Sequence, residues 1–197
     1  FRSLPGKKLP ENIIPALTWE EVDDNVYEGI DLVVSGLPTS AIKDYVKNNY
    51  ERLQMYLKRD IPFVSLSKGI DPVSLELPDD LFFDFFPEHR DLFTFLSGPS
   101  FAQEIMDQQI TLVALAGRSR KYLIKVATML DSGYFKVLIG YDVKGTLLGG
   151  ALKNILAISG GIIEGLGYNH NTRAAMITRG ISEMLKFGKV FNARPET

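Results

Sequence analysis

The sequence predicts an α/β fold in which a partial doubly wound parallel sheet is followed by the start of an all-helical domain. Short β-rich runs alternate with helical patterns up to about Gly140. This alternation is typical of a parallel sheet with helices on its faces. No β-rich run follows, and residues 142–166 are rich in Gly, Ala, Ile and Leu, as expected of a helix buried on most sides.

Five compact apolar runs are expected to form the strands: residues 31–37, 62–66, 93–96, 111–116 and 134–139. Apolar residues recur at helical spacing within residues 42–57 and 119–130, which predicts helices between strands. Two strands end in glycine-containing turns, Ser67-Lys68-Gly69 and Gly98-Pro99-Ser100, and a helix is expected to begin at the second. Ligands of such sheets gather at the carboxyl ends of the strands, so these turns are candidate binding elements.

We place a domain boundary near Tyr141. Beyond it, Ala174, Ile177, Ile181, Met184 and Leu185 form a stripe that predicts a second, amphipathic helix. Two helices are too few to cover a domain so apolar, and the chain opens on a polar loop rather than a strand. We therefore expect this sequence to be the central portion of a larger fold.

Composition excludes several classes of function. Lys plus Arg (22) against Asp plus Glu (24) gives a net charge of −2, which offers nucleic acid and anionic membranes no electrostatic attraction. The absence of Cys excludes disulfides, zinc–thiolate sites and thiol nucleophiles, and two His residues disfavour a histidine-built metal site. No uninterrupted apolar run approaches the roughly 20 residues of a membrane span. We expect a cytoplasmic, metal-free protein without membrane insertion.

The segment Gly149-Gly150-Ala151-Leu152-Lys153-Asn154 is the most unusual in the chain. Two glycines within a helix cost about 1 kcal/mol each relative to Ala, which is tolerable where a backbone or ligand must approach closely. Lys153 follows among apolar neighbours, and a buried ammonium must be paired or have its pKa lowered. It either has a function, as a general acid or base or as a group that binds an anion, or it extends to the surface from a packed helix.

The two turns also leave alternatives open. Lys68 is either held over the top of the sheet by a tight turn at Gly69 or simply solvated. The free backbone N–H groups of the Gly98-Pro99-Ser100 turn either hold an anion or only begin a helix.

Four segments occur in one order and spacing: LSKGI, SGPSFAQEI, DVKGTLLGGALKNILAISGGIIEGLG and NTRAAMITRGISEMLKFG. With these motifs the chain resembles the bacterial form of the NAD(P)-dependent glycerol-3-phosphate dehydrogenases over nearly its whole length. The resemblance implies a Rossmann-type fold, NAD or NADP as cofactor, and a phosphorylated small-molecule substrate. It further implies interconversion of dihydroxyacetone phosphate and sn-glycerol 3-phosphate for glycerophospholipid synthesis, in the cytoplasm, with a homodimer common in the family.

The resemblance also assigns residues. Lys153 matches the family's catalytic lysine, which also binds substrate, and Lys68 matches a lysine that contacts substrate and cofactor. Gly98 and Ser100 match substrate contacts, and Ala102 matches a cofactor contact. Residues 1–141 then form a partial dinucleotide-binding domain without its first Gly-rich turn, and residues 142–197 begin the helical substrate domain.

This sequence departs from the family pattern at Leu147, where Glu is usual. The change could alter the contacts that orient the Lys153 side chain. Two alternatives remain at this point. One is a related 6-phosphogluconate- or 2-hydroxy-acid-type dehydrogenase, which would not be expected to carry GGALKN with the later GLG and ITRG. The other is a non-catalytic fragment or interaction module of the same fold, since the glycine-rich cofactor turn is absent from the sequence.

Overall fold

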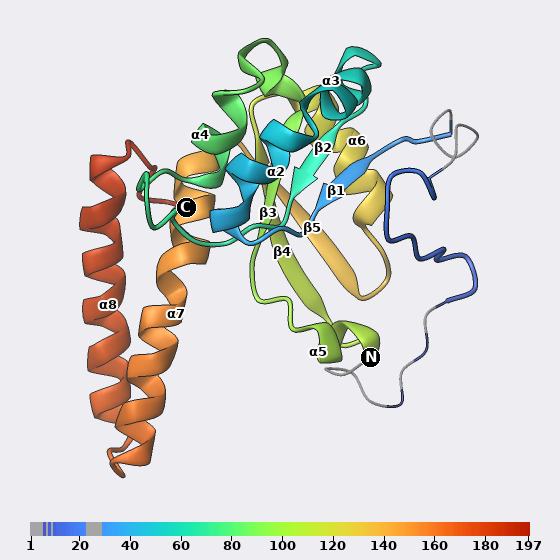
Figure 1. The fold of residues 1–197 in the computed structure, drawn as a ribbon. Coiled ribbons are helices and arrows are strands. Elements are labelled where there is room, and N and C mark those ends of the chain that lie inside the picture. Colours follow the sequence, from blue (N-terminus) through green and yellow to red (C-terminus); the bar gives the residue numbers. More distant parts are fainter. Residues whose placement is uncertain (1–5, 7, 9, 23–28) are drawn as a thin grey trace.

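The computed structural model describes residues 6, 8, 10–22 and 29–197. Its centre is a five-stranded sheet in the order β1-β2-β3-β4-β5 (Figure 1). The strands are β1 (Val33–Ser35), β2 (Phe63–Ser65), β3 (Phe93–Ser97), β4 (Thr111–Gly117) and β5 (Phe135–Gly140). All five lie within or overlap the apolar runs of the sequence, so the prediction of five strands before about Gly140 is confirmed.

The sheet is mixed, and the prediction of a purely parallel sheet is wrong at one pair. β1, β2 and β3 are mutually parallel, as are β4 and β5, but β3 and β4 are antiparallel. The connection between them contains only the short helix α5 (Ala102–Met106), which has no buried residue. A parallel crossover needs a helix packed across the sheet face, and this connection supplies none, so the chain returns beside β3 in the opposite direction.

Helices cover the sheet and share the aromatic core with its strands. They are η1 (Thr39–Ala41), α2 (Ile42–Asn48), α3 (Tyr50–Lys58), α4 (Pro78–Phe83), η2 (Pro87–Leu92) and α6 (Arg120–Leu130). The largest buried cluster joins α2, α3 and α4 to β3, with Phe82, Phe86 and Phe93 stacked at its centre. A smaller cluster packs Leu123 and Val126 of α6 against β4. These clusters fix the strands whose ends carry the candidate residues.

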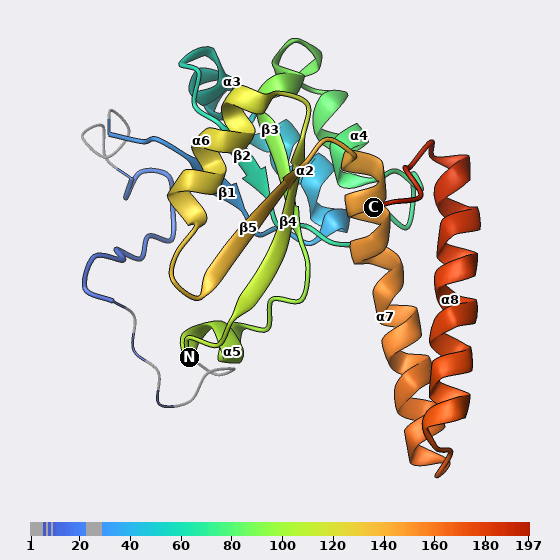
Figure 2. The same ribbon diagram turned by 180° about the vertical axis from the view of Figure 1, so that it is seen from behind.

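The chain then leaves the sheet as two long helices, α7 (Val143–Gly165) and α8 (His170–Val190). They lie side by side and project away from the sheet (Figures 1 and 2). Asp142 is the N-cap of α7: its Oδ1 accepts a hydrogen bond from the Gly145 backbone N–H at 2.9 Å. No strand occurs within residues 145–187, all of which the structure describes, so the predicted change to helix after about Asp142 is confirmed.

Only the first half of α7 is buried. Val143, Leu147 and Leu148 enter the main apolar core, whereas Ile155 and Ile158 beyond Lys153 are 60% and 66% exposed. The expectation of a helix buried on most sides therefore holds for the inner turns alone. By length and composition α7 would also suit a membrane span, a criterion that core helices of soluble proteins meet as well. The sequence expectation that no such segment exists is not supported.

Candidate active site

The turn after β3 is the point on which the predicted site residues converge. Gly98 has a φ of +144°, in the region that favours glycine. A β-carbon at this position would also lie 3.1 Å from the Cα of Val113 on β4. The turn thereby presents its Gly98 carbonyl oxygen, which accepts a hydrogen bond from Lys68 Nζ at 3.3 Å and from Lys153 Nζ at 3.0 Å.

Lys68 is held in place by the loop after β2. Its backbone carbonyl accepts a hydrogen bond from Thr39 Oγ1 at 3.2 Å, and the hydroxyl of Ser67 donates to the Leu37 carbonyl at 2.7 Å. The loop is thus tied to the turn after β1, and the Lys68 ammonium reaches across to Ser100 Oγ at 3.2 Å. Partial burial, and then the neighbouring Lys153, lower the pKa of Lys68. Lys68 is therefore held over the carboxyl end of the sheet, as the first of its two alternatives predicted.

The paired glycines of α7 have different surroundings. A β-carbon at Gly150 would lie 2.5 Å from Ser97 Oγ, whereas one at Gly149 would meet nothing within 4 Å. Only Gly150 is therefore needed for the close approach of α7 to the end of β3. That approach brings Lys153, three positions further on, to the Gly98 carbonyl. Ser97, which receives the helix, was not singled out from the sequence, although it directly precedes the Gly98 turn.

Lys153 is half-buried, and its ammonium bonds to Gly98 rather than extending to the surface. Each ammonium has three N–H donors, so both lysines keep donors for a ligand. Among the described residues neither lysine is bonded to a carboxylate. Two cations that share a neutral carbonyl, with a serine hydroxyl beside them, form a site suited to an anion.

The remaining predicted residues occupy different positions. Ser100 belongs to the cluster through Lys68. Ala102 is the first residue of α5, two positions further along the chain, and is exposed. No contact joins it to either lysine, so its role as a cofactor contact stays a prediction. Leu147, the departure from the family pattern, is buried in the main core, where an apolar side chain is well accommodated.

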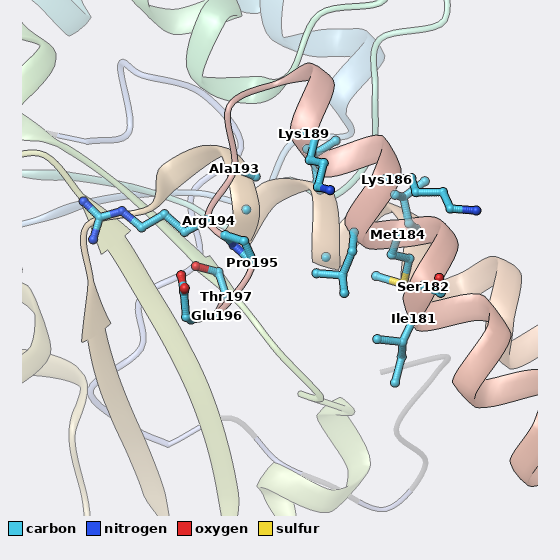
Figure 3. Close-up of a pocket in the computed structure, with 16 residues that line it drawn as sticks. Ile181, Ser182, Met184, Lys186, Lys189, Ala193, Arg194, Pro195, Glu196 and Thr197 are labelled. Carbon is cyan, nitrogen blue, oxygen red and sulfur yellow. The ribbon is translucent and has the colours of Figure 1, made fainter.

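A cavity of about 670 Å³ lies elsewhere, between α7, α8 and residues 193–197 (Figure 3). Its α7 lining includes Gly145, Gly149 and Leu152, a face of the helix other than the one that carries Gly150 and Lys153. None of the predicted site residues lines it. The convergence of charged groups, and not this cavity, therefore marks the candidate site.

Comparison with known proteins identifies the family of the chain. The family model for the N-terminus of NAD-dependent glycerol-3-phosphate dehydrogenase matches residues 1–123, and the model for the C-terminus matches residues 142–197. The chain belongs to this family. The alternative of a 6-phosphogluconate- or 2-hydroxy-acid-type dehydrogenase is thereby set aside.

Individual relatives show how much of the family fold is present. The glycerol-3-phosphate dehydrogenase [NAD(P)+] of Carboxydothermus hydrogenoformans is 36% identical over 100% of this chain and 56% of its own length. That of Leptospira biflexa is 34% identical over 98% of this chain and 57% of its own. The crystal structure of the Coxiella burnetii glycerol-3-phosphate dehydrogenase superposes with a TM-score of 0.83 at 26% identity, covering 99% of this chain and 57% of that one. The chain thus spans about half the length of the relatives it matches.

Proposed function

We propose that the protein interconverts dihydroxyacetone phosphate and sn-glycerol 3-phosphate with NADH or NADPH, and so supplies the backbone of glycerophospholipids. One observation carries the proposal. The Lys68 and Lys153 ammonium groups meet at the Gly98 carbonyl, beside Ser100, without a bonded carboxylate among the described residues. An anionic ligand would be attracted to such a pair, and the substrates of this reaction carry a phosphate.

The two lysines differ in their backbone support, which suggests different roles. Lys68 comes from a loop tied to the sheet and faces Ser100, an arrangement suited to holding the substrate in place. Lys153 comes from a helix and has only the Gly98 carbonyl as a partner among the described residues. Lys68, by contrast, also donates to the Ser100 hydroxyl. Because Lys153 has no second side chain bonded to it among the described residues, and because the family resemblance gives this position the catalytic lysine, we assign Lys153 as the general acid.

The reaction requires a hydride and a proton. Bound NAD(P)H would supply the hydride to the ketone carbon, which becomes the secondary alcohol carbon. Lys153 donates the proton to the former carbonyl oxygen and regains one from solvent, while both ammonium groups stabilise the negative charge that develops on that oxygen. General acid catalysis of this kind contributes roughly 10²–10⁴-fold to the rate.

The residues present fit the reactive end of a dinucleotide. Ser35, the last residue of the edge strand β1, has a buried hydroxyl without a hydrogen-bond partner among the described residues. It lies at the carboxyl end of the parallel strands, where this class of sheet binds nucleotides. Lys68 and Ala102 would contact the cofactor there. The Gly-rich turn that holds a pyrophosphate does not occur in these 197 residues.

Two further expectations accompany the proposal. A cytoplasmic location is expected from the composition and the family resemblance, and a homodimer from the resemblance alone. Light scattering on the purified full-length protein tests the second of these.

The proposal is tested with the Lys153→Met variant of the full-length protein. The substitution keeps most of the side-chain length but removes the charge and the donors, so kcat for dihydroxyacetone phosphate reduction should fall by roughly 10²–10⁴-fold. The thermal melt should be retained. Lys58→Met is the matched control, because Lys58 is an exposed lysine on α3 whose bonded partner among the described residues is Gln54. A near-normal kcat in a folded Lys153→Met protein would remove this lysine from the mechanism. Inactivity of the wild type with both NADH and NADPH would favour the non-catalytic alternative.

A further inference from the structure

A second lysine on α7 makes the most enclosed charge contact among the described residues. Lys144 Nζ lies 2.9 and 2.8 Å from the two carboxylate oxygens of Asp79, and 2.6 Å from both oxygens of Asp80. Both acids belong to the first turn of α4. We call Lys144, Asp79 and Asp80 the Lys144 cluster. Its position, joining α4 to the beginning of α7, was not indicated by any motif in the sequence.

The Lys144–Asp79 contact is largely removed from solvent, whereas Asp80 lies at its edge. The Asp79 side chain is 5% exposed, that of Lys144 is 27% exposed and that of Asp80 is 40% exposed. Removing charges from water costs free energy, so a buried ion pair is weak evidence for stability, and a requirement for defined geometry is another reason for it to be present. Burial raises the pKa of Asp79 even though Lys144 opposes the shift, which agrees with a contact that is not optimised for stability.

The geometry of α7 connects this cluster to the candidate site. Lys144 and Lys153 are nine positions apart, which is about 13.5 Å along the axis and half a turn around it. Lys144 therefore holds the side of α7 opposite to Lys153. The apolar contacts of Val143 and Leu147 are not directional and leave rotation of the helix about its axis open. An ammonium between four fixed carboxylate oxygens restricts that rotation, as does Ser97 against Gly150 on the other side.

We propose that the Lys144 cluster is a positioning device that sets the rotation of α7 and thereby places the Lys153 ammonium at the Gly98 carbonyl. The inference deepens the proposed function and rests on it for its effect on catalysis. The required tolerance is small, since a displacement of about 1 Å at a reacting group can cost as much as about 10²-fold in rate. Lys144, Asp79 and Asp80 need not touch substrate or cofactor.

The test separates positioning from stability. Lys144→Met alone leaves the buried Asp79 carboxylate unpaired and should destabilise the fold. The double variant Lys144→Met/Asp79→Asn removes that unpaired charge, so its thermal melt should return toward that of the wild type. We expect its kcat to remain about 10-fold or more below wild type, with KM for dihydroxyacetone phosphate changed less than about 3-fold. Lys144→Arg, which keeps the charge and can still bond both acids, should recover most of kcat.

Lys136→Met is the matched control, since it removes an exposed lysine of β5 that pairs with Asp131 at 2.8 Å; its kcat should equal that of the wild type. A folded double variant with wild-type kcat would overturn the proposal.

A second readout does not depend on activity. These 197 residues contain no Cys, so spin labels at Glu164→Cys near the end of α7 and Lys58→Cys on α3 report the orientation of the helix. The double variant should broaden or shift the distance distribution between the labels, whereas Lys136→Met should not. If the wild-type protein shows no dehydrogenase activity, the proposed function fails and this measurement alone decides the positioning. An unchanged distribution would overturn it.

Discussion

The inner and outer halves of α7 are similarly apolar in sequence but differ in what surrounds them. Leu147 and Leu148 are 4% and 3% exposed, in the same core as the aromatic residues of α4. Ile158 and Ile162, about three and four turns further on, are 66% and 58% exposed. In the outer half, α8 is the contacting helix, with Leu156 packed against Gly180. Apolar composition alone therefore did not determine burial; contact with the sheet did.

This difference explains where the candidate site lies. Lys153 is positioned at the end of the buried half, immediately after Gly150 has met Ser97. A residue at this position of α7 is anchored by the sheet on one side. On the other side it lies where the exposed outer half of α7 begins. The site thereby combines a rigid support with access for a small ligand, the combination that a preorganised catalytic group requires.

The largest expected effect on stability compares the two halves directly. Leu147→Ala should lower the free energy of unfolding by about 2–5 kcal/mol, because it opens a cavity in the main core. Ile158→Ala should change it by only about 0.5 kcal/mol, as is usual at exposed positions. Urea unfolding of the full-length variants measures both. A cost above about 1.5 kcal/mol for Ile158→Ala would show that another part of the protein covers the outer half.

The main elements of the fold were predictable because their signals are local. Each β-rich run and each helical pattern depends on residues within one segment. The antiparallel return of β4 was not predictable from such patterns, because it depends on whether the intervening helix packs on the sheet, and α5 does not. Residues 42–57 likewise divide into two helices at Asn49, whose side chain bonds back to the Tyr45 carbonyl at 2.8 Å and accepts from Trp19 Nε1.

In the candidate site, too, local features were predictable and contacts between distant segments were not. The motif GGALKN drew attention to Lys153 and to both glycines, and the glycine turns drew attention to Lys68 and Gly98. That only Gly150 meets Ser97, and that Lys144 pairs with two acids 64 and 65 positions earlier, depends on contacts between distant segments. One sequence carries no signal for such contacts, since the same residues on a solvated face would look identical.

A smaller effect on stability is expected from alanine at Gly149 or Gly150. The two substitutions should act in opposite directions although the positions are adjacent on α7. Gly150→Ala would place a β-carbon 2.5 Å from Ser97 Oγ, so the Ser97 side chain, α7 or the end of β3 must shift. Such overpacking costs about 1–3 kcal/mol, and the displacement of Lys153 should lower kcat. Gly149→Ala meets nothing within 4 Å and should stabilise the helix by up to about 1 kcal/mol. Thermal melts and kcat measured together test this, and equal effects of the two substitutions would contradict it.

The smallest expected effect concerns the charge state of Lys68. Burial first, and the nearby Lys153 ammonium second, hold the pKa of Lys68 below its usual value of 10.5. Between the lowered pKa and 10.5, the unfolded chain binds more protons at this lysine than the folded protein does. The contribution of Lys68 to the free energy of unfolding therefore rises with pH across this window, and its cost is largest and constant below the lowered pKa. Lys68→Met removes that contribution, so the stability advantage of the variant should be greatest at neutral pH and shrink as the pH approaches 10.5.

Urea unfolding of wild type and variant between pH 7 and 10.5 measures the difference, which is small because the Lys68 side chain remains partly solvated. A stability advantage of Lys68→Met that grows with pH would show that the folded protein stabilises the charged form of Lys68. That result would argue against Lys68 and Lys153 as a pair of cations without a counter-charge at the Gly98 turn.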